Sequence, residues 1–370
     1  MKNKINILFT IPNFETAGSG KVLYDLAKGL NKEKFDVSIA CSNNRGGFFS
    51  TVESLGLPIH ILDSTKPLKP YYNLYFRVKP FVGFLKQHQF DIVHSWNWSS
   101  DWSEVLATRL SGAKFIYTKK AMTWGNIHWK IKSYFSSFII TINEEMKDYF
   151  PSKKNQKLIP LGIDTNYFNP KKFEKNNNNQ VFKIVTVANL VMVKGFETLI
   201  KAIAELDNPK IQLEILGEKR IEILEDGSEY NYFEVLQGLV SKLNLENQVK
   251  FLGKRSDVRP YLASADLYVI PSKKEGMPMA LVEAMTMEIP VLGSDISGIN
   301  YVLNAFPELL FEVENYKLLS EKILDMYQKT PFERTTTGVA LREYCLTHFS
   351  MEKFIVAHEN LYRKMTLNAN

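Results

Sequence analysis

The chain has 370 residues, of which 45% are hydrophobic and 23% charged, which is ordinary for a globular protein. This length predicts two domains, because single cores rarely grow beyond roughly 250–300 residues. Charge is uneven: residues 1–165 hold 22 Lys and Arg against 13 Asp and Glu, a balance of +9, and the remainder balances at −3. A basic first half suits an anionic partner, and solvated lysines are the plainer explanation.

Several classes of site are disfavoured. The opening segment has too short an apolar part for a signal peptide, and no run approaches the roughly 18–20 apolar residues of a membrane span. Cys41 and Cys345 are not in a metal-type spacing, so we expect buried thiols in a reducing cytoplasm. No metal is expected, since the six histidines are scattered and no Asp-x-Asp pair occurs. No nucleic-acid motif accompanies the basic half, and nucleic acid is not an expected partner.

The first half alternates strand-like and helix-like segments. Expected strands are 5–11, 37–41, 59–62, 90–94, 114–117 and 138–142, and expected helices are 72–87, 102–110 and one from Ser19 or Gly20 to Leu30. This alternation predicts a parallel, doubly wound α/β sheet. In such sheets, ligands lie beyond the carboxyl ends of the strands.

A boundary and a second alternating half follow. The polar run Asn176–Gln180 predicts a solvated linker. Expected strands are then 181–187, 211–216, 249–252, 267–270, 290–293 and 309–311, and expected helices are 195–206, 229–243, 279–287, 315–328 and 351–365. We expect the ligand between two α/β halves of similar size.

The segment Pro271–Met285 predicts a tight loop and a helix after a buried strand. Gly276 lets the backbone approach a ligand closely, and the helix that starts near Pro278 presents unpaired N–H groups. The pattern favours an anion site in which Glu275 and Glu283 accept hydrogen bonds from sugar hydroxyls on either side of a diphosphate. An ordinary β–α turn with two solvated glutamates has the same spacing.

A lysine stands at the corresponding place after the strand 181–187. Asn189 and Lys194 bracket this loop, and Gly195 opens the next helix. An ammonium above a helix N-terminus suits a phosphate, although a lysine here can equally be a surface residue. Its position at the same sheet edge as Glu275 and Glu283 favours the phosphate.

The first half offers two further candidates. Gly18-Ser-Gly20 opens a helix and could bring N–H groups to an anion or a sugar hydroxyl, but Leu23 in place of a third glycine disfavours a nicotinamide dinucleotide. His94 ends a strand and either meets a substrate hydroxyl, handles a proton or is structural. Trp96 and Trp98 could line a sugar pocket, although we expect at least one of them to pack in the interior.

In combination these motifs resemble the retaining glycosyltransferases of family four. Glu275-Gly-Met-Pro-Met-Ala-Leu-Val-Glu283 is similar to the family's E-x7-E motif, and Ala17–Ala27 is similar to its N-terminal glycine-rich loop and helix. Residues 159–168 resemble its I-P-N-G-V-D segment between the domains, and Val185–Gly195 resembles its V-G-R-L-x-x-x-K-G loop. The likeness covers nearly the whole chain.

The resemblance implies the GT-B fold, with two Rossmann-like doubly wound α/β domains facing across a cleft. Its last helix would cross back to the N-terminal domain. The implied acceptor-binding domain is residues 1–165 with 350–370, and the implied nucleotide-sugar domain is residues 166–349.

It also implies roles for single residues. Glu283 would bind the nucleotide ribose, Glu275 the donor sugar, and Lys194 the diphosphate, while His94 would contact the transferred sugar. The implied catalytic residues are His94, Lys194 and Glu275, and the implied donor-binding residues are Gly18, Ser19, Gly20, Asn189, Lys194, Gly276, Met277, Pro278, Leu281 and Glu283. Two residues depart from the family: Asn189 replaces an arginine, and Trp96 replaces the second histidine of an H-x-H pair.

We therefore expect a metal-independent retaining glycosyltransferase without a cofactor. It would move a hexose from a UDP- or GDP-sugar to a glycan or lipid-linked acceptor in cell-surface polysaccharide synthesis. The alternative is a non-catalytic GT-B subunit that binds a partner. An anionic membrane surface is a further expected partner, through Lys119, Lys120, Lys130 and Lys132 and the aromatic segments 96–98 and 124–129. The expected location is the cytoplasm, including the inner face of the membrane.

Overall fold

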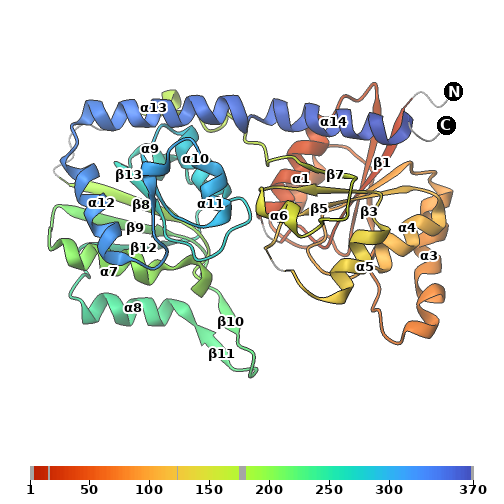
Figure 1. Cartoon of the computed structure of the whole chain (residues 1–370), viewed down its shortest axis with the longest axis horizontal. Helices are drawn as coiled ribbons and strands as arrows, with labels where there is room; N and C mark the ends of the chain where they lie inside the picture. Colours follow the sequence, from red (N-terminus) through yellow and green to blue (C-terminus); the bar gives the residue numbers. More distant parts are fainter. Residues whose placement is uncertain (1–3, 16, 123, 175–180, 368–370) are drawn as a thin grey trace. The chain divides into compact units, whose positions relative to one another are not determined.

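The computed structural model describes residues 4–15, 17–122, 124–174 and 181–367, so the expected linker Asn176–Gln180 lies outside the described residues. The chain divides into two compact units (Figure 1). Unit 1 is Met1–Gly162 with Met351–Asn370, and unit 2 is Ile163–Ser350. Where the sequence placed boundaries at residues 165 and 350, the division falls at Gly162 and Met351.

Unit 1 is built on a seven-stranded parallel sheet with the strand order β3-β2-β1-β4-β5-β6-β7. Its strands are β1 (Ile5–Ile11), β2 (Phe35–Cys41), β3 (Ile59–Ile61), β4 (Ile92–Ser95), β5 (Lys114–Lys119), β6 (Phe138–Thr141) and β7 (Gln156–Leu158). The first strand pairs on both sides, with Ile7 opposite Val37 and Ile92. Helices cover both faces of such a sheet, which explains why β4 is buried throughout and β1 is buried from Ile7 onward.

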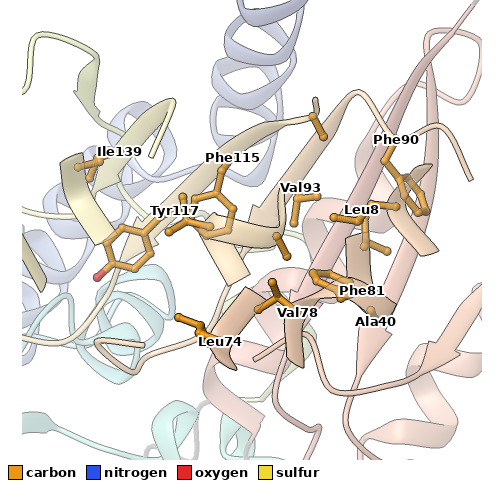
Figure 2. Close-up of a cluster of buried hydrophobic side chains, with 14 of the residues drawn as sticks. Leu8, Ala40, Leu74, Val78, Phe81, Phe90, Val93, Phe115, Tyr117 and Ile139 are labelled. Carbon is orange, nitrogen blue, oxygen red and sulfur yellow. The ribbon is translucent and has the colours of Figure 1, made fainter. Parts of the chain in front are cut away.

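The helices of unit 1 include α3, which buries a clear apolar stripe. They are α1 (Ala17–Gly29), α2 (Phe49–Glu53), α3 (Leu74–Gln87) with the preceding 3-10 turn η1 (Tyr71–Asn73), α4 (Ser103–Ser111), α5 (Ile127–Phe135), α6 (Glu145–Asp148) and α14 (Met351–Leu367). Figure 2 shows Leu74, Val78 and Phe81 of α3 in one cluster with side chains of the sheet. Their spacing of three and four residues places them on one helical face.

The last helix, α14, belongs to unit 1 and packs on α1 and β1. Gly29 permits this contact, because a Cβ there would lie 2.0 Å from Cδ1 of Ile355. Glu359 accepts a hydrogen bond from the N–H of Asn31 at 2.9 Å. The expected return of the C-terminal helix to the first domain is confirmed.

Unit 2 is built on a six-stranded parallel sheet with the order β12-β9-β8-β13-β14-β15 and carries a separate hairpin, β10-β11. Its strands are β8 (Phe182–Val187), β9 (Ile211–Leu216), β10 (Ile221–Ile223), β11 (Glu229–Asn231), β12 (Val249–Gly253), β13 (Leu267–Ile270), β14 (Val291–Ser294) and β15 (Leu310–Phe311). Its α-helices are α7 (Phe196–Leu206), α8 (Tyr232–Lys242), α9 (Arg259–Ala263), α10 (Met279–Thr286), α11 (Ser297–Val302), α12 (Tyr316–Gln328) and α13 (Pro331–His348), and its 3-10 turns are η2 (Pro170–Lys172), η3 (Met192–Lys194) and η4 (Pro307–Leu309). Two α/β units, each on a parallel sheet, confirm the predicted fold class.

Three of the differences from the sequence predictions have a clear local cause. The helix expected from residue 229 begins at Tyr232, because Glu229–Asn231 pairs with Ile221–Ile223 as a strand. The first helix begins at Ala17, ahead of the expected Ser19 or Gly20. The helix α13 is not predicted by the sequence, since its polar residues blur the apolar period; its start is fixed by a capping box between Thr330 and Glu333.

Candidate functional site

The predicted anion site in unit 2 is formed by two loops at the carboxyl ends of β8 and β13. These strands are neighbours in the sheet, so the loops that follow them meet at one edge. The N–H of Lys273 donates to the carbonyl of Val193 at 2.8 Å, which joins the two loops directly. The arrangement brings Lys194 and Glu275 together from positions 81 residues apart.

The centre of this edge is an ion pair. Nζ of Lys194 lies 2.6 Å from Oε1 of Glu275, with 23% and 12% of the two side chains exposed. The buried hydroxyl of Ser272 donates to the same carboxylate oxygen at 2.8 Å. Because two donors hold one oxygen, the orientation of Glu275 is fixed, while the side chain of Lys194 stays partly exposed.

Gly195 makes the close approach of the loops possible. Its φ of +64° lies in the left-handed region, and a Cβ at this position would lie 2.2 Å from the carbonyl oxygen of Pro271. Only glycine meets both conditions without strain. The glycine that follows Lys194 is therefore required for the geometry of the ion pair.

Glu283 lies in α10, the helix that follows the Glu275 loop, and is partly exposed. Its charge and that of Glu275 both act on the buried Tyr268, whose pKa is raised first by burial and then by Glu283 and Glu275. On the other side of the loop, Gly298 of α11 allows its backbone to approach Glu275 and Gly276, since a Cβ there would lie 2.5 Å from the carbonyl oxygen of Glu275. The two carboxylates of the E-x7-E segment therefore both lie close enough to Tyr268 for their charge to act on it.

The other predicted donor-binding residues of unit 2 divide into accessible and buried. Asn189 is exposed and Gly276 is partly exposed. Met277 and Pro278 are buried, and Leu281 has no exposed surface. The side chain of Leu281 faces the core and its N–H donates to the carbonyl of Pro278 at 3.1 Å, and its predicted role in donor binding stays a prediction.

In unit 1, His94 is enclosed. Its side chain has no exposed surface, Nδ1 lies 2.7 Å from the hydroxyl of Tyr362, and Nε2 lies 2.7 Å from the hydroxyl of Thr118. Burial, followed by the charges of His358 and Lys120, holds its pKa well below the usual range. The expectation that His94 contacts a sugar does not agree with this geometry, in which the neutral ring secures α14 to the sheet.

The glycine-rich segment of unit 1 lies in the first turn of α1. Gly18 is exposed with open space around it, Ser19 is partly exposed, and Gly20 is buried. A Cβ at Gly20 would lie 3.0 Å from the ring of Phe14. The predicted role of these three residues in donor binding stays a prediction.

The lysines expected to meet a membrane are mostly not on the surface. Lys119 and Lys132 have no exposed side chain, and Lys119 lies 3.9 Å above the ring of Trp129. Lys132 donates to the carbonyl of Ser99 at 3.0 Å, and burial lowers its pKa. The prediction that these two lysines meet a membrane is therefore wrong, because their side chains are buried and their ammonium groups lie over the rings of Trp129 and Tyr117.

The neighbouring residues are divided between buried and exposed. Lys120 is half-buried and donates to the carbonyl of Trp96 at 2.6 Å, and burial together with Lys132 lowers its pKa to about 7. Trp96 is fully buried, as expected for at least one of the two tryptophans, and Trp98 is 45% exposed. Lys130 is exposed.

Two residues that carry this architecture were missed by sequence reasoning. Ser272 orients Glu275, and its only signal is a hydroxyl directly after a strand. Glu104 is a fully buried carboxylate that accepts from Ser95 at 2.6 Å and from Asn97 at 2.9 Å, and so fixes the loop after β4. Its signal, an acid in the first turn of a helix, is shared by many surface residues.

The described residues were also compared with the requirements of a metal site and of a membrane span. No group of three or more His, Cys, Asp or Glu residues in the described part of the chain lies where it could hold a metal ion. Within the same residues, no helix combines the length and the apolar character needed to cross a bilayer. Both cysteines, Cys41 and Cys345, are buried free thiols.

Comparisons with known proteins place the chain in one family. The model described as Glycosyltransferase Family 4 matches residues 16–167, and the model described as Glycosyl transferases group 1 matches residues 168–337. The chain is 23% identical to the UDP-Gal:alpha-D-GlcNAc-diphosphoundecaprenol alpha-1,3-galactosyltransferase of Escherichia coli, with 92% of each chain covered. It is 28% identical to the N-acetyl-alpha-D-glucosaminyl L-malate synthase of Bacillus anthracis over 180 residues, which are 48% of this chain and only 44% of that protein.

The fold has close counterparts among solved structures. The crystal structure of HepE of Anabaena in complex with UDP and glucose superimposes with a TM-score of 0.79 at 18% identity, over 99% of this chain and all of that one. Two family models that follow one another along the sequence, and two parallel α/β sheets that match such a structure, lead to one assignment. The chain belongs to the group 1 glycosyltransferases of family four, which have the GT-B fold.

Proposed function

We propose that this protein is a retaining glycosyltransferase that moves a hexose from a UDP- or GDP-sugar to a glycan or lipid-linked acceptor in cell-surface polysaccharide synthesis. The observation that carries the proposal is the ion pair of Lys194 and Glu275, held by Ser272 at the carboxyl edge of the unit 2 sheet. A lysine with a partly exposed side chain, next to an oriented carboxylate, suits a diphosphate joined to a sugar.

In this proposal the donor binds to unit 2. Lys194 neutralises charge that develops on the leaving diphosphate, Glu275 accepts hydrogen bonds from the donor sugar, and Glu283 accepts them from the nucleotide ribose. Two named relatives support this reading, a HepE structure that contains UDP and glucose and a galactosyltransferase whose name gives a UDP donor and a diphosphate lipid acceptor. We propose that the acceptor binds to unit 1.

We also propose that transfer does not require a metal ion. The ammonium of Lys194 and the N–H groups at the start of α10 supply the positive potential that the leaving group needs. Transfer in the presence of excess EDTA should proceed at the rate measured without it. A rate that collapses on chelation and returns with Mg²⁺ or Mn²⁺ would contradict this part of the proposal.

Matched variants test the assignment of the site. Lys194→Ala and Glu275→Gln should each lower the transfer rate by roughly a hundredfold or more if both groups stabilise charge in the transition state. Lys183→Ala is the control: its ion pair with Glu214 has similar exposure, 27% and 15%, and lies near the opposite end of β8. If all three variants lose the same fraction of activity, the loss comes from folding and the assignment fails.

A non-catalytic binding subunit is the second candidate. Asn189 favours it, because an amide stands where the family commonly has an arginine, and so does the enclosure of His94. Calorimetry with UDP and GDP distinguishes the two functions. Absence of binding by folded protein at millimolar nucleotide would favour the subunit, and binding that is lost in Lys194→Ala would favour the transferase.

A further inference from the structure

An exposed aromatic surface lies on η1 and the first turn of α3 in unit 1. The exposed fractions are 86% for Tyr72, 69% for Phe76 and 55% for Tyr75, and Tyr71 is half exposed. These positions follow a helical spacing of three and four residues, opposite the face that Figure 2 shows buried in the core. Packing within unit 1 therefore leaves Tyr72, Tyr75 and Phe76 mostly uncovered, and we call these three side chains together with Tyr71 the aromatic surface.

The aromatic surface is held rigidly. The guanidinium of Arg77 donates to the carbonyls of Leu68, Lys69 and Pro70, at 3.0, 3.0 and 2.6 Å. On the other side, the ring of Tyr71 stacks on His128 at 6.5 Å between centroids, next to Ile127, which is 61% exposed. The start of α5 thus extends the surface with another apolar side chain.

The charge around this surface has one sign. The segments that carry the surface, residues 64–90 and 124–135, contain no Asp or Glu and seven Lys and Arg, of which Lys132 is buried. Lys69, Lys79 and Lys130 are exposed, and among the described residues none of the three forms an ion pair within 4.0 Å. The flanking carboxylates are directed inward or paired: Asp101 accepts from the N–H of Ser103 at 2.8 Å, and Asp63 lies 4.0 Å from Nζ of Lys66.

We propose that the aromatic surface of η1, α3 and the start of α5 is where this protein docks on an anionic lipid bilayer. Aromatic rings beside unpaired lysines suit the interface of a bilayer. There the rings contact the acyl chains and the ammonium groups contact the lipid headgroups. A protein partner would need acidic groups complementary to the lysines, whereas an anionic bilayer supplies both the charge and the apolar layer. Access to a lipid-linked acceptor would be the reason for docking, and that reason rests on the proposed function. The evidence for the docking surface does not depend on the proposed function.

Flotation with vesicles tests the proposal on the full chain. The protein should float with vesicles of phosphatidylcholine and phosphatidylglycerol, float less with pure phosphatidylcholine, and be released by salt. Lys69→Gln with Lys79→Gln should lower the partition coefficient by about thirtyfold, from about 1 kcal/mol for each lysine near an anionic surface. Tyr72→Ser with Phe76→Ser should lower it by roughly tenfold or more, because both rings leave the apolar layer.

The matched controls lie in unit 2. Phe332 is 80% exposed on α13, so Phe332→Ser removes an equally exposed ring, and Lys201→Gln with Lys242→Gln removes two exposed charges. These variants should float like the wild type. Equal losses in the controls and in the aromatic-surface variants would overturn the proposal, as would folded wild-type protein that does not float with the anionic vesicles.

Two further outcomes separate this proposal from others. If the wild type does not float and Tyr72→Ser with Phe76→Ser instead lowers its sedimenting mass, the surface joins copies of the chain and the lipid proposal is wrong. Flotation needs neither donor nor acceptor, so it can succeed while transfer and UDP binding fail. In that case the docking surface stands and the proposed function does not.

Discussion

Replacing Gly195 by alanine perturbs the contact that brings Lys194 to Glu275. An alanine in the left-handed region costs about 1–2 kcal/mol. Its Cβ would start 2.2 Å from the carbonyl oxygen of Pro271, so the two loops must separate by about 1 Å to reach van der Waals contact. Separation also weakens the hydrogen bond from Lys273 to Val193, worth about 1 kcal/mol. We expect the free energy of unfolding of unit 2 to fall by about 2–4 kcal/mol.

The assay compares Gly195→Ala with Gly253→Ala. Gly253 has a similar φ of +72° in the same unit, but nothing lies within 4 Å of the Cβ it would gain. Gly253→Ala should therefore cost only the backbone strain, whereas Gly195→Ala should lower Tm by about 4–12 °C and weaken UDP binding at least about tenfold. If the two variants melt together and bind UDP equally well in calorimetry, the close approach of the loops does not shape the site.

Three further predictions follow from single contacts. Asn189→Arg should raise the affinity for UDP, measured by calorimetry, by about tenfold or more, since it adds a charge-assisted donor five residues before Lys194. An unchanged affinity would mean that Asn189 does not face the diphosphate. Arg342→Ala should lower the free energy of unfolding, measured by urea titration, by about 2–4 kcal/mol. The side chain of Arg342 is only 15% exposed and donates to the carbonyls of Phe168 and Thr286, which would each lose a partner. A loss below about 0.5 kcal/mol would refute this. Burial lowers the pKa of His358 from 6.5 to about 4, so the unfolded state binds the proton first as pH falls. The contribution of His358 to the stability of unit 1 is therefore fully present above about pH 6.5 and is lost toward pH 4, by up to about 1.4 kcal/mol per pH unit. His358→Leu should flatten that slope in pH-dependent melting.

The sequence predicts those parts of the molecule that depend on local pattern. The strands β9 and β13 are found at their predicted bounds, because a short apolar run between turn residues admits few alternatives. The loop containing Glu275 and the position of Lys194 also follow from local signals, a strand end followed by glycine and a helix start. Neighbouring parallel strands then place such loops at the same edge, which is why a pair 81 residues apart can be anticipated.

What the sequence does not predict depends on packing between distant segments. His94 reads as a strand-end functional group until Tyr362, 268 residues later, occupies its Nδ1. Lys119 and Lys132 read as surface charges until tryptophan and tyrosine rings enclose them. Burial of a polar group is decided by which side chains meet it in three dimensions, and periodicity within one element carries no information about that.

The return of α14 to unit 1 has a consequence for the order of synthesis. The seven strands of unit 1 are synthesised before Gly162, but the helix that packs on β1 and bonds His94 is made only after unit 2. All of unit 2 is translated in between, which takes roughly 10–40 s at about 5–20 residues per second. During that interval the nascent first unit exposes the face that α14 covers in the folded structure, where Phe354 and Leu361 are buried. A premature stop after α13 would leave this face open permanently and give chaperones and proteases a substrate, even though every predicted donor-binding residue would be present.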